Sequence, residues 1–273
     1  MLIAQITDTH IKAEGRLAFD TVDTAPALSR CIAAVEAARP KPDVVLITGD
    51  LVDNGTAEEY ARLKAILAPL TIPVYLIPGN HDERGALRTA FGDAGYFPAD
   101  GEFLQYTIEN WPVRLIGIDT VVPRRPHGEL CDARLAWLDD RLSEQPDRPT
   151  VVFMHHPPFA TGIAFMDMYA LKQPERLGAV IARHPQVERL LCGHVHRSIQ
   201  VRFHGTVASI APSSAHQLTL DLTATPNGAF MLEPPGFHLH LWRKDTGLVT
   251  HNAVIGDYAG PYSFFDKSGK FIQ

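Results

Sequence analysis

Cysteine is scarce in this sequence. Its 273 residues contain three cysteines, Cys31, Cys131 and Cys192, and none of them belongs to a CxxC pair. A disulfide-stapled secreted scaffold needs more cysteines and a thiolate zinc site needs closer spacing, so both classes are excluded. We expect reduced thiols that are mostly buried.

Long apolar runs and an excess of positive charge are also absent. No segment approaches the roughly 20 apolar residues of a membrane-spanning helix. The first apolar stretch, Leu2–Ile6, follows no positively charged residue, unlike the apolar region of a secretion signal. The net charge of -6 argues against the basic surface with which proteins bind nucleic acid polymers. The sequence therefore predicts a cytoplasmic protein whose partners include neither a membrane nor a nucleic acid.

The composition is that of a globular protein. Hydrophobic residues make up 45% and charged residues 21% of the chain, which is long enough to bury a sizeable core. No Ser/Gly-rich or highly charged linker divides it, so we predict a single domain over residues 1–273. The GxxxxGK[ST] loop that cradles nucleoside triphosphates is missing.

Short apolar runs bounded by turn residues alternate with helical patterns along the first two thirds of the chain. Continuous apolarity is typical of strands buried on both faces, and alternation with helices indicates a mainly parallel α/β sheet. The predicted strands lie at 2–6, 43–50, 74–79, 113–119, 150–156 and 189–194. The predicted helices lie at 25–40, 56–70, 132–145 and 174–185, the second with a capping box from Thr56 to Glu59.

Two segments depart from this pattern. Residues 197–273 contain short β-rich runs, which we interpret as antiparallel strands that form the second sheet of a two-layer sandwich. Residues 157–175 are rich in apolar side chains without a strong helical stripe and resemble a lid. Their larger side chains could stack on a substrate, or could belong to the core or an oligomer contact: Phe159, Phe165, Met166 and Tyr169.

Oxygen and imidazole side chains follow five of the predicted strands. Each one alone is readily explained as a turn residue or a core histidine. Together they would place many polar groups at one sheet edge, where burial costs several kcal/mol each unless they are paired or bind metal. The candidate ligands are Asp8, His10, Asp50, Asn80, His155, His194 and His196.

These seven ligands exceed the capacity of one ion and therefore predict two metals. Their mixture of carboxylate, amide and imidazole suits Fe, Mn, Co or Zn. Asp50 is the candidate bridge between the two ions. We expect the pairs Asp8-x-His10 and His194-x-His196 to lie on extended backbone, with both side chains of a pair on one side. Glycines 49, 79 and 193 precede the ligands and permit tight turns.

The blocks "DTH", "GDLVD", "GNHD", "HHPP" and "GHVH", which span residues 8–196, resemble the calcineurin-like metallophosphoesterase superfamily. The later "EPPGFHLHLW" and "YAGPY" resemble its class III cyclic nucleotide phosphodiesterases and glycerophosphodiesterases. The resemblance implies a four-layer αββα sandwich and a homo-oligomer. It implies a first ion held by Asp8, His10, Asp50 and His196. It implies a second ion held by Asp50, Asn80, His155 and His194, with His155 favoured over His156.

The predicted activity is metal-dependent hydrolysis of small phosphodiesters by attack of a metal-bound hydroxide. His81 is the candidate phosphate contact or proton donor to the leaving group, and Asp82 the carboxylate that orients it. His216 is a candidate pocket residue with an equally plausible packing role.

Cyclic nucleotides of the 3',5'-cAMP type are the first choice of substrate, and glycerophosphodiesters are the alternative. A phosphoprotein phosphatase is a further alternative. A different class of hypothesis is a metal-binding interaction scaffold without activity, which the presence of every ligand and of His81 disfavours.

Overall fold

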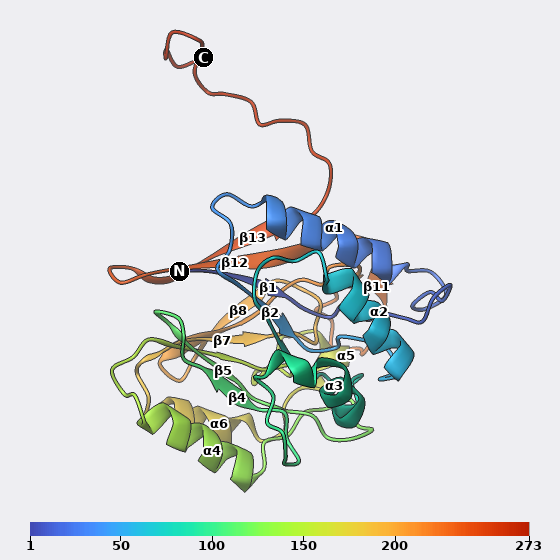
Figure 1. The fold of residues 1–273 in the computed structure, drawn as a ribbon, viewed down its shortest axis with the longest axis vertical. Helices are drawn as coiled ribbons and strands as arrows, with labels where there is room; N and C mark the ends of the chain where they lie inside the picture. Colours follow the sequence, from blue (N-terminus) through green and yellow to red (C-terminus); the bar gives the residue numbers. More distant parts are fainter. Residues whose placement is uncertain (273) are drawn as a thin grey trace.

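Two β-sheets lie face to face with helices on their outer sides (Figure 1). The computed structural model describes residues 1–272. Helices α1 (Thr24–Ala37) and α2 (Ala57–Leu67) cover one sheet, and helices α4 (Asp132–Ser143) and α6 (Pro174–Ile181) cover the other. The layers therefore follow the order α, β, β, α. The predicted sandwich is confirmed.

The first sheet has five strands in the order β13-β12-β1-β2-β3. Strands β1, β2 and β3 are parallel, and β12 and β13 extend the sheet antiparallel to β1. The strand bounds are β1 (Leu2–Ile6), β2 (Val44–Thr48), β3 (Val74–Ile77), β12 (Gly236–Arg243) and β13 (Gly247–Val254).

The second sheet has six strands in the order β4-β5-β6-β7-β9-β8. Strands β5, β6, β7 and β9 are parallel to one another, while β4 and β8 are antiparallel edges. The bounds are β4 (Tyr106–Ile108), β5 (Arg114–Gly117), β6 (Thr150–Phe153), β7 (Val187–Cys192), β8 (Ile199–Phe203) and β9 (Thr206–Ile210). A separate pair joins β10 (Gln217–Leu218) and β11 (Phe230–Met231).

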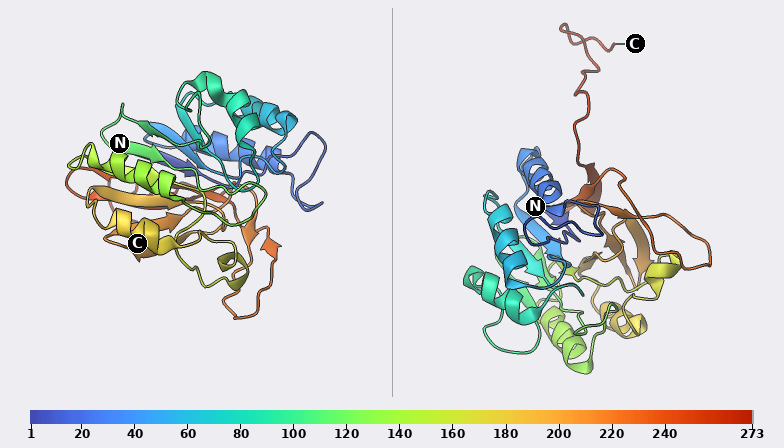
Figure 2. Two further views of the ribbon diagram at one scale, coloured as in Figure 1. Left: turned by 90° about the horizontal axis from the view of Figure 1, so that it is seen from below. Right: turned by 90° about the vertical axis from the view of Figure 1, so that its right-hand side faces the viewer.

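The interpretation of residues 197–273 as the whole second sheet is wrong. Strands β8 and β9 do join that sheet, and β9 does so in parallel with β7. Strands β12 and β13 instead pair with β1 in the first sheet. Residues 256–272 leave the sheet and extend away from the body (Figures 1 and 2). A β-rich run shows that a strand exists, but its partner is chosen by long-range pairing.

Helices α1, α2, α4 and α6 lie in the crossovers between parallel strands, as the alternation predicts, whereas α3 lies in the connection from β3 to β4. Their bounds are α1 (Thr24–Ala37), α2 (Ala57–Leu67), α3 (Arg84–Phe91), α4 (Asp132–Ser143), α5 (Ala164–Asp167) and α6 (Pro174–Ile181), with a 3-10 turn η1 (Gly92–Ala94) after α3. Helix α2 begins with the predicted capping box, because Thr56 accepts from the Glu59 amide and Glu59 accepts from the Thr56 amide. No helix among residues 1–272 has both the length and the apolarity needed to cross a bilayer.

The core consists of a layer under α1 to α3 that continues between the sheets, and a layer between the second sheet and helices α4 and α6. Helix α1 contributes Leu28, Ile32 and Val35, which lie on one face and are buried. Burying each such side chain stabilises the fold by roughly 1.5–3 kcal/mol. Cys31 and Cys192 are buried as free thiols, as predicted.

Candidate metal centre

All seven predicted ligands lie within a few residues of a strand's carboxyl end. They follow β1, β2, β3, β6 and β7, so both sheets contribute to one centre. Asn80 is half-buried and the other six are buried. Hydrogen bonds tie the two sheets together beneath the centre: Gln5 Nε2 donates to the Cys192 carbonyl (2.8 Å), and His155 Nδ1 to the Thr48 carbonyl (2.9 Å).

One cluster consists of Asp8, His10 and His196. The Nε2 atoms of His10 and His196 lie 3.2 Å apart, and His196 Nε2 lies 3.4 Å from Asp8 Oδ1. A second cluster surrounds His155, whose Nε2 lies 3.1 Å from Asn80 Oδ1.

Asp50 lies between the clusters. Its Oδ2 atom is 3.6 Å from His10 Nε2 and 3.4 Å from His155 Nε2. A single carboxylate oxygen therefore faces an imidazole of each cluster, which is the arrangement that a bridging ligand requires.

The outer nitrogens of three imidazoles are held by oxygen atoms. His10 Nδ1 donates to Asp53 Oδ1 (3.2 Å), and His196 Nδ1 donates to the His216 carbonyl (3.2 Å), as His155 does to Thr48. Such outer bonds orient metal-binding histidines and leave Nε2 free to bind. The facing Nε2 lone pairs of His10 and His196 repel each other unless a cation or a proton lies between them. The residues thus fit a metal.

The pKa values of the candidate ligands also agree with a metal site. Burial lowers the pKa of His10, and lowers that of His194 to about 3. Burial acts to raise the pKa of Asp50, but the charges of His155, His81 and His10 together outweigh it and hold this pKa well below its usual range. Burial acts to lower the pKa of His155, yet the Asp50 carboxylate raises it to about 9. Within residues 1–272, His194 Nε2 is buried without a hydrogen-bond partner.

The backbone at the ligands is not extended. Five of the seven have left-handed φ: Asp8 (52°), His10 (42°), Asp50 (47°), His194 (73°) and His196 (52°). The expectation that each i, i+2 pair faces one ion on extended backbone is therefore wrong. Asp8 and His10 do meet, through a turn, whereas His196 joins them and His194 approaches His155. Non-glycine residues in this conformation are strained, and such strain is typical of functional sites.

Two of the predicted glycines are required by close packing. A Cβ on Gly79 would lie 2.2 Å from the Asp50 amide and from Asp50 Oδ1. A Cβ on Gly193 would lie 2.1 Å from Thr7 Oγ1. The backbone approaches the ligand loops more closely than any side chain would allow.

His156 and His216 flank the clusters. Both ring nitrogens of His156 have protein partners, because Nδ1 accepts from Thr120 Oγ1 (2.8 Å) and Nε2 donates to the Pro126 carbonyl (3.2 Å). This supports the choice of His155 as the ligand. The His216 ring packs 4.6 Å from the His196 ring, and its Nδ1 is buried without a partner in the described residues.

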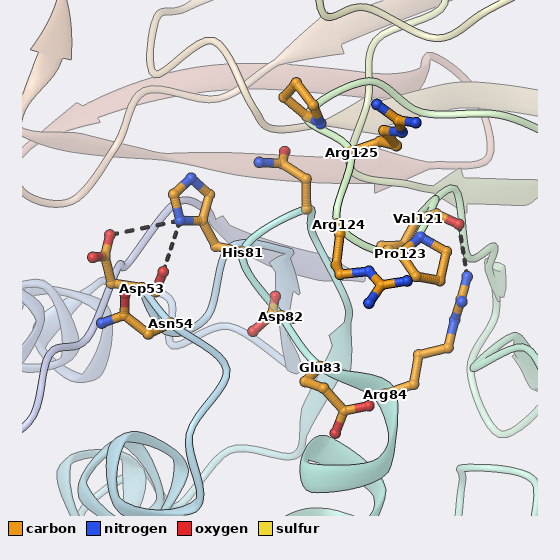
Figure 3. A pocket seen from close by; sticks show the side chains of 12 residues that line it. Asp53, Asn54, His81, Asp82, Glu83, Arg84, Val121, Pro123, Arg124 and Arg125 are labelled. Atoms are coloured by element: carbon orange, nitrogen blue, oxygen red, sulfur yellow. Dashed lines mark hydrogen bonds and ion pairs between the residues drawn. The ribbon is translucent and has the colours of Figure 1, made fainter.

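The predicted pairing of His81 with Asp82 is wrong. His81 Nδ1 donates to the Asp53 carbonyl (2.8 Å) and lies 3.7 Å from Asp53 Oδ1 (Figure 3). Asp82 is buried and accepts from the Gly79 and Leu51 amides and from the Tyr60 hydroxyl. The role of Asp53 was missed, although it is the last residue of the "GDLVD" block and this could have drawn attention to it.

Two pockets open from the centre and share Asn80, His81 and Pro126. The first, which we call the aromatic pocket, has a volume of about 390 Å³. Beside ligands and His216, it is lined by Phe19, Phe165, Met166, Tyr169 and Phe230. The second, which we call the arginine pocket, has a volume of about 490 Å³. Beyond the shared residues, it is lined by Asp53, Asn54, Asp82, Glu83, Arg84, Val121, Pro123, Arg124 and Arg125 (Figure 3).

Residues 157–175 contribute to both the core and the aromatic pocket. Ile163 and Leu171 are buried in the layer beside the second sheet, while Phe165 and Tyr169 line the pocket. A Cβ on Gly228 would lie 2.6 Å from the Phe165 ring, so the loop between β10 and β11 packs against α5 (Figure 2).

Proteins similar in sequence to this chain include some that are named as phosphodiesterases. A probable glycerophosphodiester phosphodiesterase GpdQ from Arcobacter nitrofigilis is 40% identical over all of this chain and all of its own length. The 3',5'-cyclic adenosine monophosphate phosphodiesterase CpdA of Escherichia coli (strain K12) is 33% identical over 79% of this chain and 76% of its own.

Solved structures share the fold at low sequence identity. A dimetal phosphatase from Danio rerio superposes with a TM-score of 0.69 and 14% identity, covering 94% of this chain and 99% of its own. The profile of the family described as calcineurin-like phosphoesterase matches residues 1–198, which contain all the predicted ligands. This match agrees with the clusters at the strand ends and with the sandwich. The chain belongs to the calcineurin-like phosphoesterase family.

Proposed function

We propose that this protein is a phosphodiesterase that hydrolyses small phosphodiesters with two divalent metal ions. The observation that carries the proposal is the position of Asp50 between the His10 and His155 clusters, in the wall of the aromatic pocket. Cyclic nucleotides of the 3',5'-cAMP type are the first candidate substrates. Glycerophosphodiesters are the second, because the relative named for that activity is similar over its whole length.

The proposed ligands of the first ion are Asp8, His10, Asp50 and His196, and those of the second are Asp50, Asn80, His155 and His194. The ligand atoms suit Fe, Mn, Co or Zn. When bound, such a pair of ions lowers the pKa of a coordinated water and stabilises the charge on the phosphate oxygens during in-line displacement.

His81 is the proposed catalytic side chain. Because its Nδ1 donates to the Asp53 carbonyl, Nε2 is left for the substrate, and 37% of the side chain is exposed at the junction of the pockets. Burial acts to lower the pKa of His81, but the Asp50 charge, the bond to the Asp53 carbonyl and the Asp53 charge together outweigh it and raise this pKa. A protonated His81 can contact a phosphoryl oxygen or deliver a proton to the departing alkoxide.

Asp82 is proposed as a positioning residue and not as a catalytic one. Its carboxylate accepts from Gly79 N (2.8 Å), Leu51 N (3.1 Å) and the Tyr60 hydroxyl (2.9 Å). These bonds join the loop after β2 to the loop after β3. Asp82 therefore holds Asp50 and Asn80 in register with each other.

The aromatic pocket supports a substrate with a flat or apolar group. Phe19, Phe165, Tyr169 and Phe230 surround a space beside His196 and His216. Aromatic walls of this kind accept a nucleobase by stacking. We propose that residues 157–175 form the lid of this pocket. We also propose that residues 1–273 form a single domain and that the protein is cytoplasmic.

Oligomer formation is proposed from exposed apolar side chains. Leu220, Leu222 and Leu232 lie around the β10–β11 pair, and Tyr262 and Phe264 lie in the extended carboxyl-terminal segment. Exposed apolar groups of this size are typical of protein contacts. A second copy of the chain is the partner that we propose.

Reconstitution with metal tests the function. Protein stripped with a chelator is loaded with Mn, Fe, Co or Zn, and turnover is measured for cAMP, a glycerophosphodiester, bis(p-nitrophenyl) phosphate and p-nitrophenyl phosphate. We expect metal-dependent cleavage of diesters in preference to the monoester. A monoester preference would instead indicate a phosphatase, and binding of metal without turnover would indicate a scaffold.

A further inference from the structure

The centre has a second pocket whose chemistry differs from that of the first. The aromatic pocket offers rings, whereas the arginine pocket offers cations, and both pockets begin at Asn80 and His81. A phosphodiester held at the centre would therefore have one pocket available for each of its two alcohol groups.

Arg124 and Arg125 are exposed, and within residues 1–272 neither guanidinium makes a hydrogen bond or an ion pair. Figure 3 shows Arg124 pointing into the pocket, below the loop that carries both arginines. Five N–H donors on each rigid guanidinium suit a carboxylate or a phosphate group.

The other charged groups of the pocket already have partners. Arg84 forms a bidentate pair with Asp119 at 2.7 and 2.9 Å. Asp53 pairs with Lys12 at 2.6 Å, and Glu83 accepts from two amides at the start of α3. Apart from His81 at the junction of the pockets, the positive charge that remains available is thus that of Arg124 and Arg125, in a chain with a net charge of -6.

The loop that carries these arginines is well anchored. Val121 and Gly128 form a bridge across its base, and the Pro126 carbonyl accepts from His156 Nε2. A Cβ on Gly128 would lie 2.5 Å from the His156 ring, so loop and ring are in close contact. Since His156 follows His155, the loop is held at a set position relative to the centre.

We propose that the arginine pocket binds a second anionic group, a carboxylate or a phosphate, on one alcohol of a linear phosphodiester whose other alcohol lies in the aromatic pocket. This rests on the proposed phosphodiesterase function. It names a substrate class that is represented neither by a cyclic nucleotide nor by a glycerophosphodiester whose only charged group is the phosphodiester.

A matched pair of substrates tests the proposal. The 2-carboxyethyl and propyl esters of p-nitrophenyl phosphate have the same length and differ in one negative charge. We expect Arg124→Gln and Arg125→Gln each to lower the carboxyethyl-to-propyl ratio of kcat/KM by roughly 3- to 10-fold, with the propyl ester nearly unaffected. Arg202→Gln, which removes an exposed arginine on β8, is the control and should leave the ratio unchanged.

The outcomes separate the two proposals. Equal ratios in wild-type, Arg124→Gln and Arg202→Gln proteins would overturn the role of the arginine pocket while leaving the phosphodiesterase intact. Failure of the wild-type protein to cleave the propyl ester would count against the proposed function. In that event, calorimetric binding of the corresponding non-hydrolysable phenylphosphonate esters to metal-loaded protein still measures the preference for the anionic group. Equal affinities for the two esters would then reject it.

Discussion

His81 is held by Asp53 and not by its neighbour Asp82. The Nδ1 atom donates to the Asp53 carbonyl at 2.8 Å, and the same residue's carboxylate bonds to Nδ1 of His10. Asp53, in the loop after β2, thus orients both a candidate ligand and the candidate proton donor. The position of His81 is therefore tied to that of His10 in the metal centre.

Replacing His81 tests its role as a proton donor. We expect His81→Asn to lower kcat for an alkyl diester by about 100-fold, since an alkoxide leaves poorly without a proton. A p-nitrophenyl diester should be affected far less, because p-nitrophenolate leaves without protonation. His251→Asn, on exposed β13, is the control. Equal losses for both leaving groups would show that His81 acts on the phosphoryl oxygens instead.

Gly79→Ala tests the close approach of the loops after β2 and β3. The new Cβ would lie 2.2 Å from two Asp50 atoms, so these loops must separate. We expect a loss of about 2–3 kcal/mol in the free energy of unfolding, measured with urea, together with loss of metal binding. Gly92→Ala is the control, because its Cβ would meet nothing within 4 Å. Similar stabilities of the two variants would contradict the packing described.

The neighbouring histidines His155 and His156 should differ in metal content. We expect His155→Gln to lose one of two metal equivalents by elemental analysis, since its Nε2 faces Asp50 and Asn80. His156→Gln should keep both equivalents, because both nitrogens of His156 already bond to Thr120 and Pro126. A loss of metal in the His156 variant and retention in the His155 variant would reverse the assignment.

Acid should destabilise the protein through His238, on β12. Burial and the charge of Arg189 lower the pKa of His238 to about 4. Unfolding returns it to about 6.5, so the unfolded state binds the proton more tightly. The stability linked to His238 is thus present above pH 6.5 and is lost as the pH falls towards 4, by roughly 3 kcal/mol in total.

The His238→Gln variant isolates this contribution. We expect its urea unfolding free energy to fall less steeply between pH 6.5 and 4 than that of the wild type. Exposed His251→Gln should follow the wild type. Parallel pH profiles for wild type and His238→Gln would mean that His238 does not cause the loss.

Much of the site was predictable because its signals are local. A strand followed by Gly-Asn-His-Asp or Gly-His-Val-His indicates polar groups at its carboxyl end. Parallel strands bring their carboxyl ends to the same edge of the sheet. The alternation of apolar runs and helical patterns likewise predicted the parallel strands and helices α1, α2, α4 and α6 within a few residues.

The sequence by itself determined which residue types lie at the strand ends and, through them, the family and the seven candidate ligands. Only the tertiary structure decided which atoms meet. It paired β12 with β1, turned His81 to Asp53 and, among residues 1–272, left Arg124 without an ion pair beside the centre. These outcomes depend on long-range pairing and on left-handed turns at the ligands, and neither residue type nor periodicity encodes them.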